Sequence, residues 1–272
     1  MSRPGFLRLA ALPLILYALL VLGMAGLQRR MLFPAPVVAQ EQLSALAREQ
    51  GARELSLVTE DGEHLYGWRL GSGRRLVLYF GGNGGSVGGD AARLQRLVAA
   101  GAEVLQVNYR GYPGSTGVPS EEGLRADARA AWTEARRSHE AGEVVLLGKS
   151  LGGGVAVGLA AWASARGETP AALVVESSFR SVRDVARESY PWLPVDRLLR
   201  HPFDSLALAP HVGCPSLVLH GAEDTLIDVQ HGRDLAVALP GARLVEVAGA
   251  GHNDLLLADN RAWAAFLTVA GL

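Results

Sequence analysis

Six short apolar runs, separated for the most part by segments with helical patterning, limit the possible folds of this sequence more than any other feature. The runs are apolar throughout and have the length of buried strands. Such strands, separated by helices, predict an α/β fold with a mostly parallel central sheet and helices on both faces. The expected strands are residues 76–80, 104–108, 144–147, 173–176, 217–220 and 244–247, and the expected helices are residues 87–100, 120–139, 151–165, 229–239 and 254–269.

The segment before this alternation has a different pattern. Residues 37–50 are expected to form a short helix. Two further strands, residues 54–59 and 63–70, flank Asp61-Gly62, a dipeptide typical of hairpin turns. With 272 residues in all, we expect residues 37–272 to form one domain rather than two.

The first 36 residues predict a membrane anchor. From Leu9 to Gln28 no side chain is charged, and 20 helical residues extend about 30 Å, the thickness of a hydrocarbon core. Arginines flank the segment at positions 3, 8, 29 and 30. They favour the N-terminus inside by a small margin, which places the following domain on the non-cytoplasmic side.

Two other interpretations of this segment stay open. A cleaved signal peptide also has a basic start and an apolar middle, but it needs a small-residue cleavage site, and none is evident before Arg29. A buried core helix of this length would be expected to carry a polar face. The membrane anchor accounts best for both observations.

Composition and charge exclude several classes of protein. The 26 basic and 27 acidic residues leave a net charge of −1, so there is no basic excess for nucleic-acid binding. A 49% hydrophobic content is not that of a disordered chain. The single cysteine, Cys214, cannot form an internal disulfide and is expected in the core, and no Cys/His spacing indicates a metal site or a cofactor.

The candidate nucleophile is Ser150, in the sequence Gly148-Lys149-Ser150-Leu151-Gly152. Gly-x-Ser-x-Gly between a buried strand and a helix places the serine on a strained turn, where side chains at the flanking positions would collide with neighbouring backbone. Two rival glycine motifs fail. Glu143 stands where a phosphate-binding P-loop needs its first glycine, and residues 81–89 lack the dinucleotide-binding pattern.

The candidate acid and base each follow a predicted strand. Asp224 follows residues 217–220, and His252 follows residues 244–247. Ser150, Asp224, His252 is the chain order expected for a nucleophile, acid and base on an α/β sheet. His252 would accept the serine proton, and Asp224 would orient the imidazole.

We expect the other titratable residues near these positions to have structural roles or to be solvated. Asp228 is expected to cap the next helix, Glu223 to be solvated, and Asp254 to start the last helix. The remaining histidines, including His220, have no equivalent placement and are expected to be structural or exposed.

The glycine-rich segment after the strand at 76–80 is the candidate oxyanion loop. Glycines at positions 81, 82, 84 and 85 let the backbone approach a substrate carbonyl closely. We expect the backbone N–H groups of Asn83 and Leu151 to form the oxyanion hole.

The complete set of motifs resembles the single-span membrane-anchored serine hydrolases of the α/β-hydrolase superfamily. An opening antiparallel hairpin followed by βα units agrees with that layout. The family commonly has His-Gly at positions 81–82 and Asp at position 108, where this chain has Gly81-Gly82 and Asn108. The matching stretches are YFGGNGG at 79–85, NYRGYPGSTGVPSEEGLRAD at 108–127, GKSLGGG at 148–154, VVESSFRSV at 174–182, LVLHGAEDTLI at 217–227 and GAGHND at 249–254.

The resemblance implies hydrolysis of an acyl ester or thioester through an acyl-Ser150 intermediate, without a cofactor. Relatives act on carboxylic esters, lysophospholipids or palmitoyl thioesters, so a small-molecule or lipid-like acyl substrate is expected. Residues 180–213, rich in proline and without a predicted strand, are expected to form a short cap over the site. A serine peptidase acting on small peptides, or a non-catalytic binding protein that kept the fold, are the alternatives.

Overall fold

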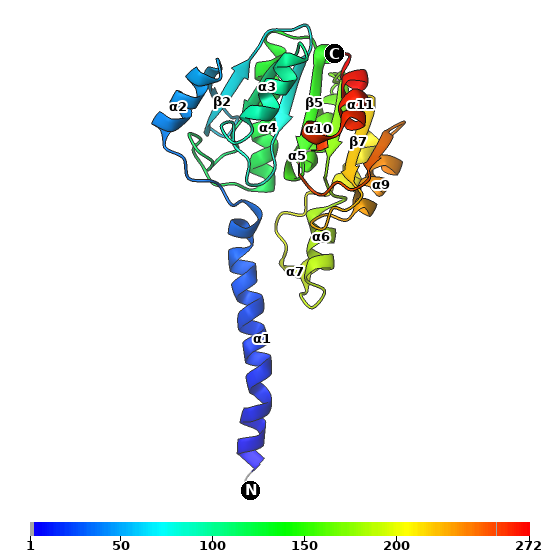
Figure 1. The fold of residues 1–272 in the computed structure, drawn as a ribbon. Coiled ribbons are helices and arrows are strands. Elements are labelled where there is room, and N and C mark those ends of the chain that lie inside the picture. Colours follow the sequence, from blue (N-terminus) through cyan, green and yellow to red (C-terminus); the bar gives the residue numbers. More distant parts are fainter. Residues whose placement is uncertain (1–2, 254) are drawn as a thin grey trace.

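A single mixed sheet organises the domain. The computed structural model describes residues 3–253 and 255–272, and within them eight strands form one sheet in the order β1-β2-β4-β3-β5-β6-β7-β8 (Figure 1). The strands are β1 (Arg53–Val58), β2 (His64–Leu70), β3 (Leu76–Phe80), β4 (Glu103–Val107), β5 (Val144–Lys149), β6 (Ala172–Glu176), β7 (Ser216–Gly221) and β8 (Arg243–Val247).

Strand direction follows the expected pattern. β1 and β2 form an antiparallel hairpin, β2 pairs antiparallel with β4, and β3 to β8 run parallel. The hairpin turn lies at Asp61-Gly62, where Gly62 has a φ of 87°. The predicted α/β architecture is therefore confirmed, with strand ends within one or two residues of their expected positions.

Helices cover both faces of the sheet, which explains why the strands are apolar throughout. Along β3, Leu76, Leu78 and Phe80 belong to one core, whereas Val77 and Tyr79 belong to the other. The first core includes side chains of α4 (Glu121–Arg136), α5 (Leu151–Ala165) and α9 (Val229–Ala238). The second includes side chains of α2 (Gln40–Glu49), α3 (Ala91–Ala99), α10 (Leu255–Ala258) and α11 (Asn260–Ala270).

Two helix predictions need correction. The helix expected at 254–269 is two helices, α10 and α11, because the side chain of Asp259 accepts hydrogen bonds from the N–H groups of Arg261 and Ala262 and starts a new helix there. The expected start at Asp254 lies outside the described residues. The helix expected at 87–100 begins only at Ala91, after Gly88 and Gly89.

Residues 180–213 contain only short helices: α6 (Val182–Ser189), α7 (Val195–Leu198), α8 (Ser205–Leu208) and the 3₁₀ turn η2 (Ala209–His211). Figure 1 shows α6 and α7 projecting from the sheet on the side where α1 (Arg3–Leu32) leaves the domain. This segment is called the cap below.

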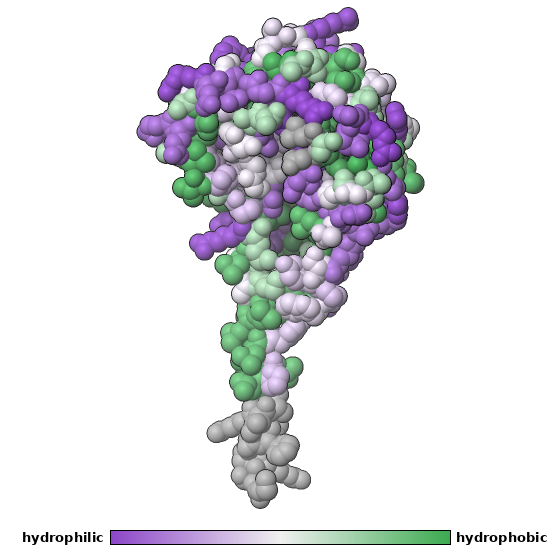
Figure 2. All heavy atoms as spheres, viewed as in Figure 1, coloured by the Kyte–Doolittle hydropathy of each residue, from purple (hydrophilic) through white to green (hydrophobic). Residues whose placement is uncertain are grey.

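The N-terminal helix α1 projects away from the domain as a stalk. Leu12–Leu32 is long and apolar enough to cross a membrane, and only 6% of its most apolar stretch is buried in the rest of the molecule. It is therefore not a buried core helix. Figure 2 shows the apolar side chains of this stalk beneath a mostly hydrophilic domain.

Candidate active site

The predicted nucleophile occupies a strained turn between β5 and α5. Ser150 has φ 52° and ψ −118°, a conformation that residues with a side chain rarely adopt. A Cβ atom at Gly148 would lie 2.3 Å from the carbonyl oxygen of Gly152, and one at Gly152 would lie 2.0 Å from that of Phe80. Both flanking glycines are thus required by contact with backbone, as the motif predicted.

Neighbouring backbone and a serine side chain hold this turn. The N–H of Ser150 donates to the carbonyl oxygen of Glu176 at the end of β6, at 2.8 Å. The Ser178 hydroxyl donates to the carbonyl oxygen of Ser150, also at 2.8 Å. The end of β6 therefore fixes the peptide groups on both sides of Ser150.

The predicted acid lies in a tight loop after β7. One carboxylate oxygen of Asp224 accepts hydrogen bonds of 2.9 Å from the N–H groups of Leu226 and Ile227. Burial raises the pKa of Asp224, but hydrogen bonds from His220, His252 and the Ile227 N–H outweigh it and hold the pKa well below its usual range. Asp224 is therefore ionised at neutral pH.

The predicted base lies between the predicted acid and the predicted nucleophile. His252 Nδ1 lies 2.8 Å from Asp224 Oδ2, and His252 Nε2 lies 3.1 Å from Ser150 Oγ. Because an ionised carboxylate can only accept, Nδ1 carries the proton and the lone pair of Nε2 faces the hydroxyl. The structure thus brings together three residues that are far apart in the chain.

A fourth residue in this arrangement, His220, was predicted to be only structural or exposed. His220 is fully buried at the end of β7, and its Nε2 lies 2.8 Å from the carbonyl oxygen of Ile227 and 3.4 Å from Asp224 Oδ2. It therefore supports the loop that carries Asp224. The one signal in the sequence was its position four residues before Asp224, at the end of a buried strand.

The glycine-rich loop lies beside the nucleophile. A Cβ atom at Gly82 would lie 3.7 Å from the Cβ of Ser150. The hydroxyls of Tyr109 and Tyr112 donate to the carbonyl oxygens of Gly81 and Asn83, which fixes the orientation of these peptides. The Leu151 N–H, at the first position of α5, has no acceptor within its own helix.

Other residues singled out in the sequence lie outside this arrangement. Asp228 caps α9 through the N–H of Gln230, and Glu223 is exposed, both as expected. Cys214 is buried, as expected, and burial raises the pKa of its thiol to about 11. Asn108 connects two loops, accepting from the Val87 N–H and donating to a backbone carbonyl.

No metal centre is evident in the described part of the chain, where no three His, Cys, Asp or Glu side chains are grouped so as to hold an ion.

Known proteins are similar in sequence to this chain. A family model described as serine aminopeptidase, S33, matches residues 71–195. An uncharacterized protein of Mycobacterium tuberculosis is 38% identical over 242 residues, which cover 86% of this chain and 83% of that protein. The lysophosphatidylserine lipase ABHD12 of Macaca fascicularis is 34% identical over 191 residues, which cover 63% of this chain and 47% of the lipase. This chain thus matches about half the length of that lipase.

Solved structures share the fold. An esterase of Pyrococcus furiosus superposes with a TM-score of 0.69 at 16% identity, covering 87% of this chain and 96% of the esterase. An α/β hydrolase of Vibrio vulnificus superposes with a TM-score of 0.71 at 22% identity, covering 94% of both chains. With the sheet order and the sequence relatives, these likenesses show that the chain belongs to the α/β-hydrolase superfamily of hydrolases.

Proposed function

We propose that this protein is a serine hydrolase that cleaves acyl esters or thioesters through an acyl-Ser150 intermediate. The observation that carries the proposal is the continuous line from Asp224 through His252 to Ser150, with contacts of 2.8 and 3.1 Å. In this line an ionised acid orients the imidazole so that its free nitrogen faces the hydroxyl, the arrangement that nucleophilic catalysis needs.

In the first half-reaction, Ser150 Oγ attacks the acyl carbonyl carbon while His252 Nε2 takes the hydroxyl proton. The carbonyl oxygen becomes negative and accepts hydrogen bonds from the N–H groups of Asn83 and Leu151. The bond to the alcohol or thiol then breaks, and the leaving group takes the proton from Nε2. Asp224 stays ionised throughout and stabilises the imidazolium.

In the second half-reaction, water replaces the alcohol. His252 Nε2 takes a proton from the water as its oxygen attacks the acyl carbon. The collapse of the second tetrahedral intermediate breaks the ester bond to Ser150 and returns the proton to Oγ. The products are a carboxylic acid and the free enzyme.

An ester lipid is the substrate class best supported. The similar protein of Macaca fascicularis is a lysophosphatidylserine lipase, which supports a lipid ester as the substrate. A serine peptidase is the second candidate, because the matching family model is described as a serine aminopeptidase.

We further propose that α1 anchors the protein in a membrane as a single span, with the catalytic domain on the non-cytoplasmic side. Its length and exposure support an anchor. Contacts with the cap support a retained helix over a cleaved signal peptide: the Tyr17 hydroxyl donates to the carbonyl oxygen of Trp192, and the Gln28 amide to that of Leu198.

The test is hydrolysis of a substrate panel by the full-length protein and its Ser150→Ala variant. The panel contains p-nitrophenyl butyrate, p-nitrophenyl palmitate, palmitoyl-coenzyme A and an aminoacyl p-nitroanilide. We expect hydrolysis of esters or thioesters, lost by a factor of about 10⁴ or more in the variant, and no cleavage of the anilide. Ser44→Ala, which removes a hydroxyl on α2, is the control. Anilide cleavage alone would favour the peptidase, and ester hydrolysis that survives Ser150→Ala would refute the proposal.

A further inference from the structure

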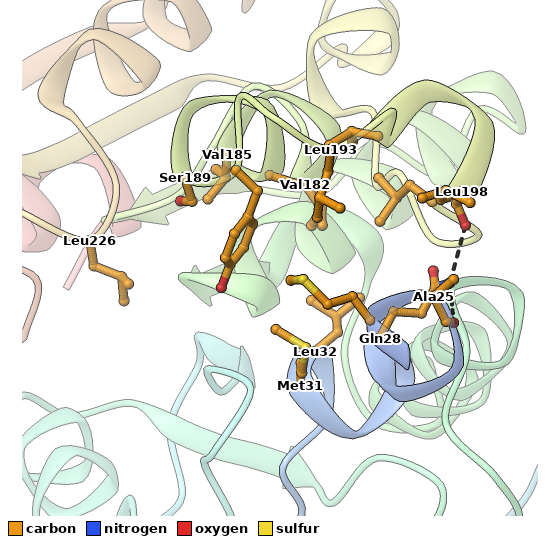
Figure 3. A pocket seen from close by; sticks show the side chains of 15 residues that line it. Ala25, Gln28, Met31, Leu32, Val182, Val185, Ser189, Leu193, Leu198 and Leu226 are labelled. Atoms are coloured by element: carbon orange, nitrogen blue, oxygen red, sulfur yellow. Dashed lines mark hydrogen bonds between the residues drawn. The ribbon is translucent and has the colours of Figure 1, made fainter. Parts of the chain in front are cut away.

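An apolar pocket lies between the end of α1 and the cap. Its volume is about 300 Å³, within the usual range of small-molecule sites. Figure 3 shows Val182, Val185 and Leu193 of the cap facing Met31 and Leu32 of α1 across this space. Most of the remaining lining side chains are also apolar.

The polar group that α1 contributes to this lining is already paired within the protein. The amide nitrogen of Gln28 lies 2.8 Å from the carbonyl oxygen of Ala25 and 3.1 Å from that of Leu198. Its amide oxygen accepts the N–H of Arg200 at 2.9 Å. Gln28 therefore connects the cap to α1. Because its amide is already hydrogen-bonded within the protein and most of the other lining side chains are apolar, the pocket favours an apolar ligand.

One end of the pocket adjoins the loop of the acid. Leu226 lines the pocket, and its N–H donates to Asp224 at 2.9 Å. A ligand in the pocket would thus lie next to the residues that position His252.

Beyond the pocket, the cap follows α1 towards its N-terminus. Tyr17 contacts Trp192 at the cap tip. Tyr17 lies 15 residues before Leu32 in the chain, about 22 Å along the helix axis. If α1 spans a bilayer, the cap tip at residues 190–193 must reach bilayer depth beside it. Trp192 is 45% exposed and packs against Tyr190, so the cap tip presents aromatic side chains beside α1.

From this geometry we propose that the pocket binds the acyl chain of an ester lipid that enters sideways from the bilayer between α1 and the cap. The proposal rests on the proposed function, because the ester bond of such a lipid would be cleaved by Ser150. A partner helix is a poor occupant, because a helix with its side chains is about 10 Å or more across and would need the cap to leave α1. A hydrocarbon chain is narrower than a helix and suits a pocket of about 300 Å³ with apolar walls.

The experiment measures kcat/KM of the full-length protein in phosphatidylcholine vesicles for p-nitrophenyl palmitate and p-nitrophenyl butyrate. Two variants fill the pocket from opposite walls: Ala25→Trp on α1 and Ala186→Trp on α6. We expect each to lower kcat/KM for palmitate about tenfold, the equivalent of roughly two methylene groups no longer buried, and to leave the butyrate value within about twofold. Leu27→Trp, on α1 but outside the pocket lining, is the matched control and should change neither value.

A second measurement does not depend on how well the variants fold. A hexadecyl fluorophosphonate with a photoreactive diazirine at the chain end is allowed to label Ser150 of the wild-type protein and is then irradiated. Cross-links within residues 24–32 or 182–199 support the proposal. Cross-links elsewhere, or an equal loss on both esters in both pocket variants, would overturn it. Absence of any Ser150-dependent labelling or hydrolysis would refute the proposed function itself, a different result.

Discussion

The turn that carries Ser150 and the junction between α1 and the cap are held together in opposite ways. At the turn, two glycines are fixed by backbone atoms that leave no room for a Cβ, and hydrogen bonds from both sides hold a strained serine. At the junction, a tyrosine and a glutamine supply the side-chain hydrogen bonds, and apolar side chains enclose an open pocket.

This difference indicates that the two regions have separate roles. Strain at a residue persists only where the surrounding structure determines it fully, and the surroundings of Ser150 do so. Segments with few packed contacts open at low free energy, which suits the proposed entry of a substrate between α1 and the cap. We therefore expect substitutions near the turn to affect the chemistry for every substrate, and substitutions at the junction to affect which substrates are accepted.

The largest effect is expected at the acid. Asp224→Asn leaves the shape of the site unchanged but favours the wrong tautomer of His252, so kcat should fall by about 10⁴. Asp228→Asn is the matched control, because an asparagine can still cap α9 and activity should stay within about twofold. Both are measured as kcat on the same short ester. Full activity in Asp224→Asn would identify another carboxylate as the acid.

A second comparison uses two glycines of one helix. Gly152→Ala places a methyl group on the carbonyl oxygen of Phe80 and should lower the free energy of unfolding by about 3 kcal/mol, with loss of activity. Gly158→Ala finds its nearest neighbour at 3.9 Å and should raise that free energy by about 0.5–1 kcal/mol. Chemical denaturation measures both, and similar values would show that the turn is not sterically fixed.

A third comparison removes side-chain hydrogen bonds in each region. Ser178→Ala frees the carbonyl oxygen of Ser150 and should lower kcat about tenfold on short and long esters alike. Gln28→Leu frees the cap from α1 and should leave kcat on butyrate within about threefold while making the cap more sensitive to protease. A large loss of kcat on butyrate in Gln28→Leu, with little loss in Ser178→Ala, would contradict separate roles for the two regions.

The smallest effect concerns pH. Because the folded-state pKa of Asp224 lies below its unfolded value of about 3.9, its ionised form stabilises the fold above that pH. This contribution, on the order of 1–3 kcal/mol, should decrease progressively as the pH falls from about 4 towards the lower folded-state pKa. The difference in unfolding free energy between wild type and Asp224→Asn should therefore shrink on acidification, as denaturation at several pH values can measure. A constant difference would rule out the depressed pKa.

The parts of the molecule that sequence could predict are those set by local patterns. Fully apolar strands require a covered sheet, and the glycines at 148 and 152 report a turn with no room for side chains. The break between α10 and α11 depends on Asp259 acting as a cap, a local signal that a continuous helical pattern concealed.

What sequence could not predict depends on contacts between distant segments. The role of His220 becomes visible only when the loop after β7 folds back over it. The pocket likewise arises because residues 24–32 and 182–199 meet, and neither segment alone has the pattern of a binding site.

The most direct test of Ser150 as an activated nucleophile is covalent labelling of the full-length protein with a fluorophosphonate, followed by mass spectrometry of its peptides. We expect a single phosphonyl adduct on Ser150, formed far more slowly in His252→Ala and absent from Ser150→Ala. An adduct on another residue, or labelling at Ser150 that proceeds at the wild-type rate without the imidazole of His252, would contradict it.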